Sequence, residues 1–292
     1  MKFQFIVNPS AGQGNYKWVI HDIQKALLNH SYDISVPEYK GEATILAKKA
    51  SSDHDVIVAV GGDGTINEVV NGLIGTHAML GIIPAGTGNG FAREFGIPLK
   101  IRDACKILLE GEPKWIDAGR AGDKYFLGTA GIGFDALIAK FAGKMLGPLR
   151  GMWLYFFAGM FVFNRYNPPL VSAKIDCLVY EVHPLLVAIA NTRLYGGRAI
   201  IAPNARPDDG FFDICVAEKM SAWRTTVHLP KLFKGTHIYL PEVKMYKCSE
   251  ISIRSPEPLP VHVDGEPIGS YSEIHFTLIP KALRVLVPKE EI

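Results

Sequence analysis

The sequence has few cysteines, and neither its cysteines nor its histidines are spaced as a metal or disulfide site requires. No two cysteines form a C-x-x-C pair, and the nine histidines show no H-E-x-x-H spacing. We therefore expect neither a zinc site nor a disulfide framework, and a reducing cytosol is the compartment that fits. The cysteines are Cys105, Cys177, Cys215 and Cys248.

The chain also lacks runs of one charge and apolar segments of membrane-spanning length. The formal net charge is +2, and no Lys/Arg-rich or aromatic-interleaved basic stretch occurs, so we expect no nucleic-acid partner. The apolar segment at 151–163 is shorter than the roughly 20 residues that cross a bilayer. The apolar run at Phe3–Val7 is too short for a signal peptide. These absences favour a cytoplasmic protein.

The composition is that of a folded protein, and one stretch organises it. With 292 residues and 48% hydrophobic residues, the chain is long enough for two domains with real cores. Val56–Val60 is an unbroken apolar run, as expected of a central parallel strand. After it, Ile66, Val69, Val70 and Leu73 form one helical stripe that should pack on the sheet, while Asn67, Glu68 and Asn71 should face elsewhere.

The turn between this strand and helix has the composition of an anion-binding loop. Gly61, Gly62 and Gly64 allow positive φ and close approach of a ligand, and amides at a helix start attract phosphate. Asp63 then stands where phosphate charge and a metal would meet. An ordinary glycine-rich turn from strand to helix has a similar sequence, so the turn alone leaves both interpretations open.

Strands and helices alternate over the first hundred or so residues. Strands are predicted at Phe3–Val7, Asp33–Val36 and Leu80–Pro84, and Glu42–Ala50 is a predicted helix. This alternation predicts an α/β fold with a doubly wound parallel sheet, whose ligands bind at the carboxyl ends of the strands. Three glycine loops fall at those ends, at 8–14, 61–64 and 85–90.

From about residue 115 the pattern changes to short strands broken by turns, which is typical of an antiparallel β-sandwich. A helical insert is predicted at about 134–163. We place the boundary near residue 116, giving an N-terminal domain at 1–116 and a C-terminal β-sandwich domain at 117–292. The strands are predicted at 115–120, 124–130, 173–180, 184–190, 211–216, 251–254, 275–278 and 284–287.

A set of short motifs in fixed order resembles the bacterial diacylglycerol-kinase-like lipid kinases over nearly the whole chain. NAD kinases share the Gly-Gly-Asp-Gly turn, but the Asn-Pro start and the Gly-Thr-Gly-Asn loop fit the lipid kinases better. The motifs begin at Asn8 (NPSAG), Gly61 (GGDGTINEV), Pro84 (PAGTGN), Phe91 (FAR), Gly131 (GIGFD), Tyr195 (YGG), Asp208 (DDG) and Asp264 (DGE).

The resemblance implies ATP-dependent phosphorylation of a lipid hydroxyl in the cleft between the two domains. Two positions depart from the family: Pro37 stands where some relatives have a nucleotide-contacting Thr, and Gly90 where many have Asp. The first departure removes a hydroxyl and an amide hydrogen. If the Asp of the relatives helps to select the acceptor lipid, the second departure implies a different acceptor lipid here. The implied nucleotide-binding residues are Asn8, Pro9, Ser10, Ala11, Gly12, Gly61, Gly62, Asp63, Gly64, Thr65, Ile66, Asn67 and Thr87.

The Asp264-Gly265-Glu266 stretch has two interpretations. It lies between two predicted strands, where Asp-Gly favours a hairpin turn for backbone reasons alone. Phosphoryl transfer to an alcohol, however, needs a carboxylate that accepts the hydroxyl proton. In the family that this chain resembles, the carboxylate that accepts the proton lies in this turn. The resemblance therefore implies Glu266 as the base, Asp264 as the residue that orients it or the metal, and Asp63 as the third catalytic acid.

The acidic stretch at 208–213 could likewise be a plain turn or a cation site. Its three carboxylates repel one another unless a cation intervenes. Some bacterial relatives bind a structural magnesium here, and their ligands correspond to Asp209 and to the carbonyls of Arg206 and Phe211. ATP and magnesium are thus the expected cofactors.

The expected acceptor is diacylglycerol or a related glycerolipid at a membrane surface, which implies peripheral membrane association. An NAD kinase, or a low-turnover lipid-binding or regulatory protein with the same fold, is the alternative. The stretch 140–163 combines Lys140, Lys144 and Arg150 with an aromatic-rich run, so it is either an interfacial segment or a buried helix. A homodimer remains open.

Overall fold

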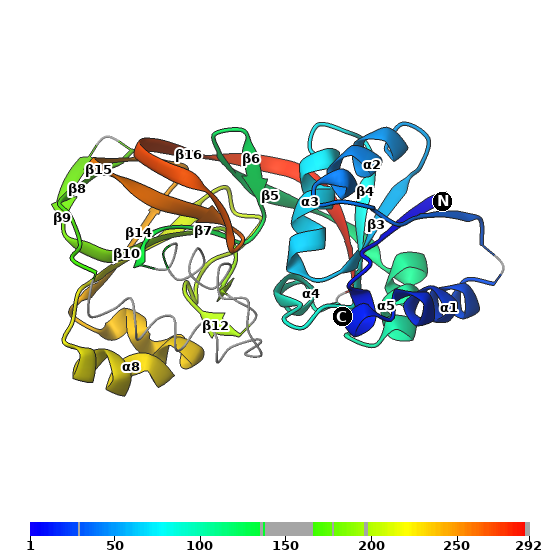
Figure 1. Ribbon diagram of the computed structural model, residues 1–292, viewed down its shortest axis with the longest axis horizontal. Coiled ribbons are helices and arrows are strands. Elements are labelled where there is room, and N and C mark those ends of the chain that lie inside the picture. Colours follow the sequence, from blue (N-terminus) through cyan, green and yellow to red (C-terminus); the bar gives the residue numbers. More distant parts are fainter. Residues whose placement is uncertain (29, 135–136, 138–165, 177, 196–197, 290–292) are drawn as a thin grey trace. The chain divides into compact units, whose positions relative to one another are not determined.

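The structure is a computed structural model that describes residues 1–28, 30–134, 137, 166–176, 178–195 and 198–289 (Figure 1). The chain divides into two compact units, the N-terminal unit (Met1–Ala118 with Pro280–Ile292) and the sandwich unit (Gly119–Ile279). The predicted second domain, 117–292, differs from the sandwich unit in its last segment, Pro280–Ile292. Residues from Pro280 onward join the N-terminal unit because Val285 pairs with Leu80.

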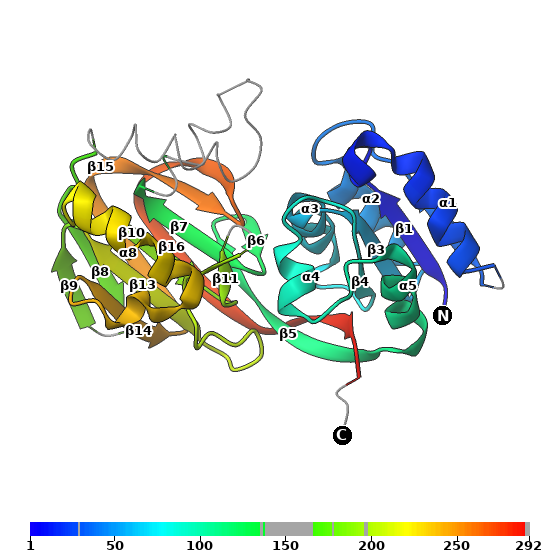
Figure 2. The ribbon, with the colours of Figure 1, turned by 90° about the horizontal axis from the view of Figure 1, so that it is seen from below.

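The N-terminal unit contains the predicted parallel sheet. Its strands pair in the order β4-β3-β1-β2, and Val285 of β16 lies beyond β4. Helices α1 and α5 cover one face, and α2 and α3 cover the other (Figures 1 and 2). The strands are β1 (Phe3–Val7), β2 (Tyr32–Ser35), β3 (Val56–Gly61) and β4 (Met79–Pro84). The helices are η1 (Ala11–Gly14), α1 (Tyr16–Ala26), α2 (Glu42–Ala50), α3 (Asp63–Leu73), α4 (Gly90–Glu94) and α5 (Ile101–Glu110).

Burial explains why these segments form a sheet and its cover. Every residue of β3 is buried, as an apolar central strand requires, and the predicted stripe of α3 is buried as well. Asn67, which we expected to face away from the sheet, is also buried and accepts a hydrogen bond from the Asn71 side chain. Both sides of α3 are thus covered, since α2 packs beside it and the Glu68 carboxylate accepts the Gly41 amide.

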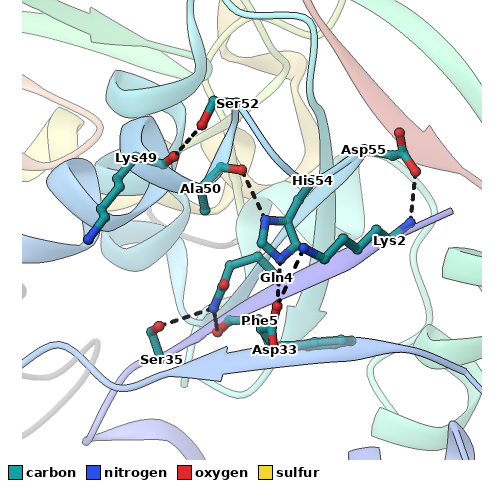
Figure 3. Close-up of polar contacts among 10 residues, drawn as sticks. All are labelled: Lys2, Gln4, Phe5, Asp33, Ser35, Lys49, Ala50, Ser52, His54 and Asp55. Atoms are coloured by element: carbon teal, nitrogen blue, oxygen red, sulfur yellow. Dashed lines mark hydrogen bonds and ion pairs between the residues drawn. The ribbon is translucent and has the colours of Figure 1, made fainter.

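Polar contacts fasten the strands at the edge of the sheet (Figure 3). The side-chain amide of Gln4 donates to the Ser35 hydroxyl at 3.1 Å, which joins β1 to β2. The His54 ring lies 2.9 Å from the Asp33 carboxylate, and the Lys2 backbone amide donates to the Asp55 carboxylate. These contacts involve no residue of the three glycine loops, and they join the segments of the chain that contain β1, β2 and β3.

The sandwich unit is antiparallel, as predicted. One sheet runs β14-β13-β10-β7 and continues into the last residues of β15, while the first residues of β15 pair with β8 and β16. Its strands are β6 (Lys124–Phe126), β7 (Thr129–Gly133), β8 (Val171–Ile175), β9 (Leu178–Val182), β10 (Pro184–Ala190), β11 (Leu194–Tyr195), β12 (Ala199–Ile200), β13 (Phe212–Glu218), β14 (Val243–Cys248) and β15 (Glu250–Val263). Two further strands, β5 (Glu112–Ala121) and β16 (Glu266–Val287), run from one unit into the other.

Aromatic side chains form the centre of the sandwich core. Phe126 and Phe212 are fully buried and stack at 5.7 Å between ring centroids, and Phe276 meets Phe126 edge-on. The strand β15 serves both sheets because its pairing with β16 shifts register between Arg254 and Leu259. A break of this kind lets one strand bend from one sheet into the other.

Several elements differ from the sequence prediction. The strand β14 was not predicted, and the strand predicted at 173–180 corresponds to β8 and β9. The strands predicted at 275–278 and 284–287 are parts of the single strand β16. The helix α8 (Ala222–Lys234), which contains Pro230, was not predicted. Ser221 caps its start by accepting the Arg224 amide, and Gly235 ends it at φ 68°. A short η2 (Thr236–Tyr239) follows.

The predicted helical insert at 134–163 and the stretch 140–163 lie almost entirely outside the described residues. None of the helices that the structure does describe combines the length and the apolar character that crossing a bilayer requires.

Candidate active site

The three glycine loops of the N-terminal unit meet at the carboxyl ends of β1, β3 and β4, as the sequence predicted. Asn8 joins the first loop to the second, because its side-chain amide donates to the Thr65 hydroxyl at 2.9 Å. The same side chain turns the first loop back on itself, since its carbonyl oxygen accepts the Ser10 amide at 2.8 Å. Asn8 thus shapes the loop from within.

The third loop, at 85–90, contacts both of the others through the backbone. Gly12 donates its amide to the Ala85 carbonyl at 3.0 Å, and the Ala85 amide donates to the Gly61 carbonyl at 2.9 Å. Asn89 closes this loop, since its side chain exchanges two hydrogen bonds with the backbone of Gly86. The three loops therefore form one continuous hydrogen-bonded group.

Two glycines of this group have opposite surroundings. A Cβ atom on Gly86 would lie 2.9 Å from the backbone nitrogen of Gly62, so the second and third loops touch backbone to backbone. A Cβ atom on Gly64 would meet nothing within 4 Å. Gly86 is needed for packing, whereas Gly64 leaves open space over the first turn of α3, where amides attract an anion.

The Asp63 carboxylate binds backbone amides. Its two oxygens accept the amides of Gly90 and Phe91, both at 3.0 Å, at the start of α4. The sequence suggested that this acid faces phosphate and metal, but the structure shows it joining the second loop to the third. Gly90, where many relatives have Asp, takes part here through its amide alone.

The predicted nucleotide residues fall into three groups by exposure. Pro9, Ser10, Gly64 and Thr87 are exposed, so their side chains and backbone are accessible to a ligand. The side chains of Ala11, Ile66 and Asn67 are buried, so they act on a nucleotide only through the backbone or by shaping the loops. Gly12, Gly62 and Asp63 are half-buried, while Gly61 and Thr65 are buried.

The Asp264-Gly265 pair forms the hairpin turn between β15 and β16. Both residues have positive φ, at 47° and 81°, which matches the two-residue turn that Asp-Gly favours. Val263 and Glu266 face each other across the turn, and Glu266 is the first residue of β16. The backbone interpretation of this stretch is therefore correct, and the turn places Glu266, half-buried, at a fixed position.

The Asp264 carboxylate holds this turn against the loop before β7. One oxygen accepts the amides of Gly128 and Thr129 at 3.0 Å, and the other accepts the Leu127 amide at 3.1 Å. The Asp264 amide also donates to the Thr129 carbonyl at 2.7 Å. With three amides on its carboxylate, Asp264 serves to fix the turn.

Sequence reasoning missed a histidine beside this turn. His262 is fully buried; its Nδ1 accepts the Gly265 amide at 3.2 Å, and its Nε2 lies 2.9 Å from the Tyr195 hydroxyl. The sequence analysis considered the histidines only as metal ligands, and none of them shows a metal-ligand spacing. The available signal was its position two residues before Asp264, since residues two apart on a strand share a face.

In the acidic stretch of the sandwich unit, the ammonium group of Lys247 contacts a carboxylate. Asp209 accepts the Phe211 amide at 3.1 Å on one oxygen and the Lys247 ammonium at 2.7 Å on the other. These contacts raise the pKa of Lys247, chiefly through the hydrogen bond to Asp209. Asp213 is buried, and this burial raises its carboxyl pKa although Lys247 opposes the shift.

A magnesium ion at this stretch would have to share Asp209 with Lys247. No group of three or more His, Cys, Asp or Glu side chains that could hold a metal occurs among the described residues. A site of one carboxylate with the carbonyls of Arg206 and Phe211 would not form such a group. The Asp209 carboxylate suits magnesium chemically, but an ion binds there only in competition with an ammonium group.

Comparison with known proteins divides the chain at nearly the same first boundary, although the second family model continues past Ile279 to residue 287. The family model described as the diacylglycerol kinase catalytic domain matches residues 2–121. The family model described as the YegS C-terminal NAD kinase beta sandwich-like domain matches residues 128–287.

Three relatives that match over nearly the full length are named diacylglycerol kinases. A diacylglycerol kinase of Mycobacterium tuberculosis is 33% identical, with 99% of this chain and 96% of the relative covered. A diacylglycerol kinase of Bacillus subtilis is 29% identical, with 99% and 97% covered. A solved structure, a putative diacylglycerol kinase from Bacillus anthracis, covers 100% of this chain and 98% of its own at a TM-score of 0.79 and 28% identity. The chain therefore belongs to the bacterial diacylglycerol-kinase-like lipid kinase family.

Proposed function

We propose that this protein is an ATP-dependent lipid kinase that phosphorylates diacylglycerol or a related glycerolipid. The observation that carries the proposal is the joined group of three glycine loops, with open space over Gly64 at the start of α3. Backbone amides at such a helix start favour the phosphates of a nucleotide. The names of the relatives support a kinase, and the choice of ATP and of a glycerolipid is our proposal.

In the proposed reaction, Glu266 accepts the proton of the lipid hydroxyl. The hydroxyl oxygen forms a bond to the γ-phosphorus, and the bond from that phosphorus to the bridging oxygen of ADP breaks. Asp264 contributes by holding the turn, because its carboxylate is bound by three amides. Asp63 contributes by holding the second and third loops together.

Magnesium is the second proposed cofactor. Bound with the nucleotide, it would neutralise charge on the phosphates. At Asp209 we propose a structural ion only in competition with Lys247, for the reason given by the 2.7 Å contact between them.

Peripheral membrane contact is proposed from the surface of α8. Trp223 is 76% exposed, and Val227 and Phe233 are exposed as well. Lys231 and Lys234 lie on the same helix, which contains no acidic residue. Exposed aromatic side chains beside cations suit an interface with anionic headgroups. We call these five residues the α8 surface.

The test is phosphoryl transfer from labelled ATP, with magnesium, to a panel of diacylglycerol, phosphatidylglycerol, sphingosine and NAD. We expect label in diacylglycerol or a related glycerolipid. Label in NAD alone would assign the protein to the NAD kinases, and label in none of the four would favour a low-turnover binding protein. Either result overturns the proposal.

The role of Glu266 is tested separately by Glu266→Gln. We expect turnover to fall by about two orders of magnitude or more with folding intact, the scale of losing a general base. Glu257→Gln is the matched control, because Glu257 lies exposed on β15 and should not affect turnover. Near-normal turnover in folded Glu266→Gln would remove this role from Glu266.

A further inference from the structure

The turn that carries Glu266 is fixed on one side by Asp264 and on the other by a buried histidine. His262 has no exposed surface, and its two ring nitrogens point to different elements. Its Nδ1 accepts the Gly265 amide at 3.2 Å, inside the turn, and its Nε2 lies 2.9 Å from the hydroxyl of Tyr195 at the end of β11.

These two contacts determine where the histidine proton lies. The Gly265 backbone N–H can only donate, so Nδ1 must present its lone pair. In a neutral ring the proton is then on Nε2, which donates to the Tyr195 hydroxyl oxygen. The Gly265 amide thus determines the tautomer, and the Tyr195 hydroxyl accepts the Nε2 proton that this tautomer carries.

We call the Asp264-Gly265 turn the acceptor turn. We propose that His262, which Tyr195 contacts at Nε2, is a positioning residue that holds the acceptor turn in the conformation that places Glu266. Asp264 fixes the first residue of the turn through the loop at 127–129, and His262 fixes the second. Because Glu266 follows Gly265 directly, conformational freedom of the Gly265 backbone would also displace the Glu266 carboxylate. This inference rests on the proposed function, in which Glu266 is the base.

The alternative is a core histidine that fills space and satisfies its own polar atoms. Two substitutions distinguish the two roles. In His262→Asn the side-chain oxygen falls close to the position of Nδ1 and can still accept the Gly265 amide. In His262→Gln the longer side chain reaches the position of Nε2 and loses that bond. A space-filling role predicts similar damage from both changes.

We expect His262→Asn to keep kcat within about threefold of the wild type, and His262→Gln to lower kcat by about tenfold or more. The reason is that a small displacement of a reacting group is costly in rate. KM for ATP should be unchanged in both variants, because the glycine loops are untouched. Equal kcat in the two variants would overturn the proposal.

A second measurement does not depend on kinase activity. Amide hydrogen exchange of the segment 262–268, without substrate, should be faster in His262→Gln than in His262→Asn and the wild type. Glu266→Gln is the control, since it should abolish turnover while leaving this exchange unchanged. Tyr195→Phe should also speed exchange, and it provides the test if the histidine variants do not fold.

The exchange measurement separates this inference from the proposed function. If the wild type phosphorylates no lipid but the exchange pattern is as expected, the kinase proposal fails and the hold on the turn stands. If exchange at 262–268 is the same in His262→Gln, Tyr195→Phe and the wild type, the hold on the turn is refuted whatever the activity.

Discussion

Asp63 and Asp264, two of the three acids that we assigned to catalysis, bind backbone amides of their own unit. Asp63 accepts two amides at the start of α4, and Asp264 accepts three from the loop before β7. A carboxylate bound in this way stabilises a loop whether or not a ligand is present. Replacing either residue should therefore lower the melting temperature as well as turnover, whereas the effect of replacing Glu266 should be on turnover.

Asp213 allows a prediction about pH. Burial raises the pKa of its carboxyl group, and no hydrogen-bond partner is found for its buried Oδ2 within the described part of the chain. A raised pKa means that the folded state favours the protonated form. This contribution to stability is therefore largest at low pH and is lost as the pH rises through the raised pKa. At pH values above the ordinary range of an aspartate, the raised pKa costs stability.

Asp213→Asn, which mimics the protonated acid, should raise the melting temperature by a few degrees at pH 7. The gain should shrink as the pH falls and vanish below about pH 4, the ordinary range of an aspartate. Thermal scans across this range measure it, with Asp123→Asn at an exposed position as the control. A lower melting temperature at pH 7 would mean that the attraction between Asp213 and Lys247 outweighs burial.

Lys247 gives the test for magnesium at the acidic stretch. Because its ammonium occupies Asp209, we expect a small magnesium-specific rise in melting temperature for the wild type and a larger one for Lys247→Met. Asp209→Ala should show none beyond an ionic-strength control. If Lys247→Met responds to magnesium no more than Asp209→Ala does, no structural ion binds at Asp209.

At the scale of elements, the glycine loops make a prediction from two similar substitutions. Gly86→Ala should destabilise the N-terminal unit, because its Cβ atom would press on the backbone of Gly62. Gly64→Ala should raise stability by up to about 1 kcal/mol, since alanine suits the first turn of a helix better than glycine. Both changes add one methyl group.

ATP binding distinguishes the two variants further. The methyl group of Gly64→Ala would enter the open space over α3, so we expect ATP affinity to fall about tenfold or more in a protein that is more stable. Calorimetric titration with ATP, beside a thermal scan, measures both quantities. Unchanged affinity in Gly64→Ala would indicate that the phosphates lie elsewhere.

The α8 surface is the element on which we test membrane contact. Trp223→Ala combined with Lys231→Glu should weaken binding to anionic phosphatidylglycerol vesicles by about tenfold, since each headgroup contact of a lysine is worth about 1 kcal/mol. Trp115→Ala is the control, because Trp115 is exposed on β5 of the N-terminal unit. Unchanged sedimentation with vesicles would exclude this surface.

The sequence predicted well the elements that depend on local pattern. The strands β1, β3 and β4 were recognisable because burial on both faces gives a continuous apolar run, and α3 because burial of one face gives an apolar stripe. The roles of single polar residues were less accessible. The partners of Asp264 lie more than 130 positions away in the chain, and Lys247 lies 38 from Asp209. Such contacts follow from strand pairing that only the fold determines.

At the scale of the whole molecule, each proposed task belongs to one unit. The glycine loops lie in the N-terminal unit, while the acceptor turn, His262 and the α8 surface lie in the sandwich unit. The two matching family models divide the chain at nearly the same place. Variants in one unit should therefore change nucleotide binding, and variants in the other should change proton transfer or lipid contact.

The return of the chain to the N-terminal unit has a consequence for folding during synthesis. Residues Met1–Ala118 emerge from the ribosome first, but β4 meets its second neighbour, β16, only after the entire sandwich unit has been made. At roughly 5–20 residues per second, that delay is on the order of ten to thirty seconds. Until then Leu80, which is fully buried in the finished protein, lacks its neighbour Val285. The unit that is translated first is thus the one that must wait to be completed.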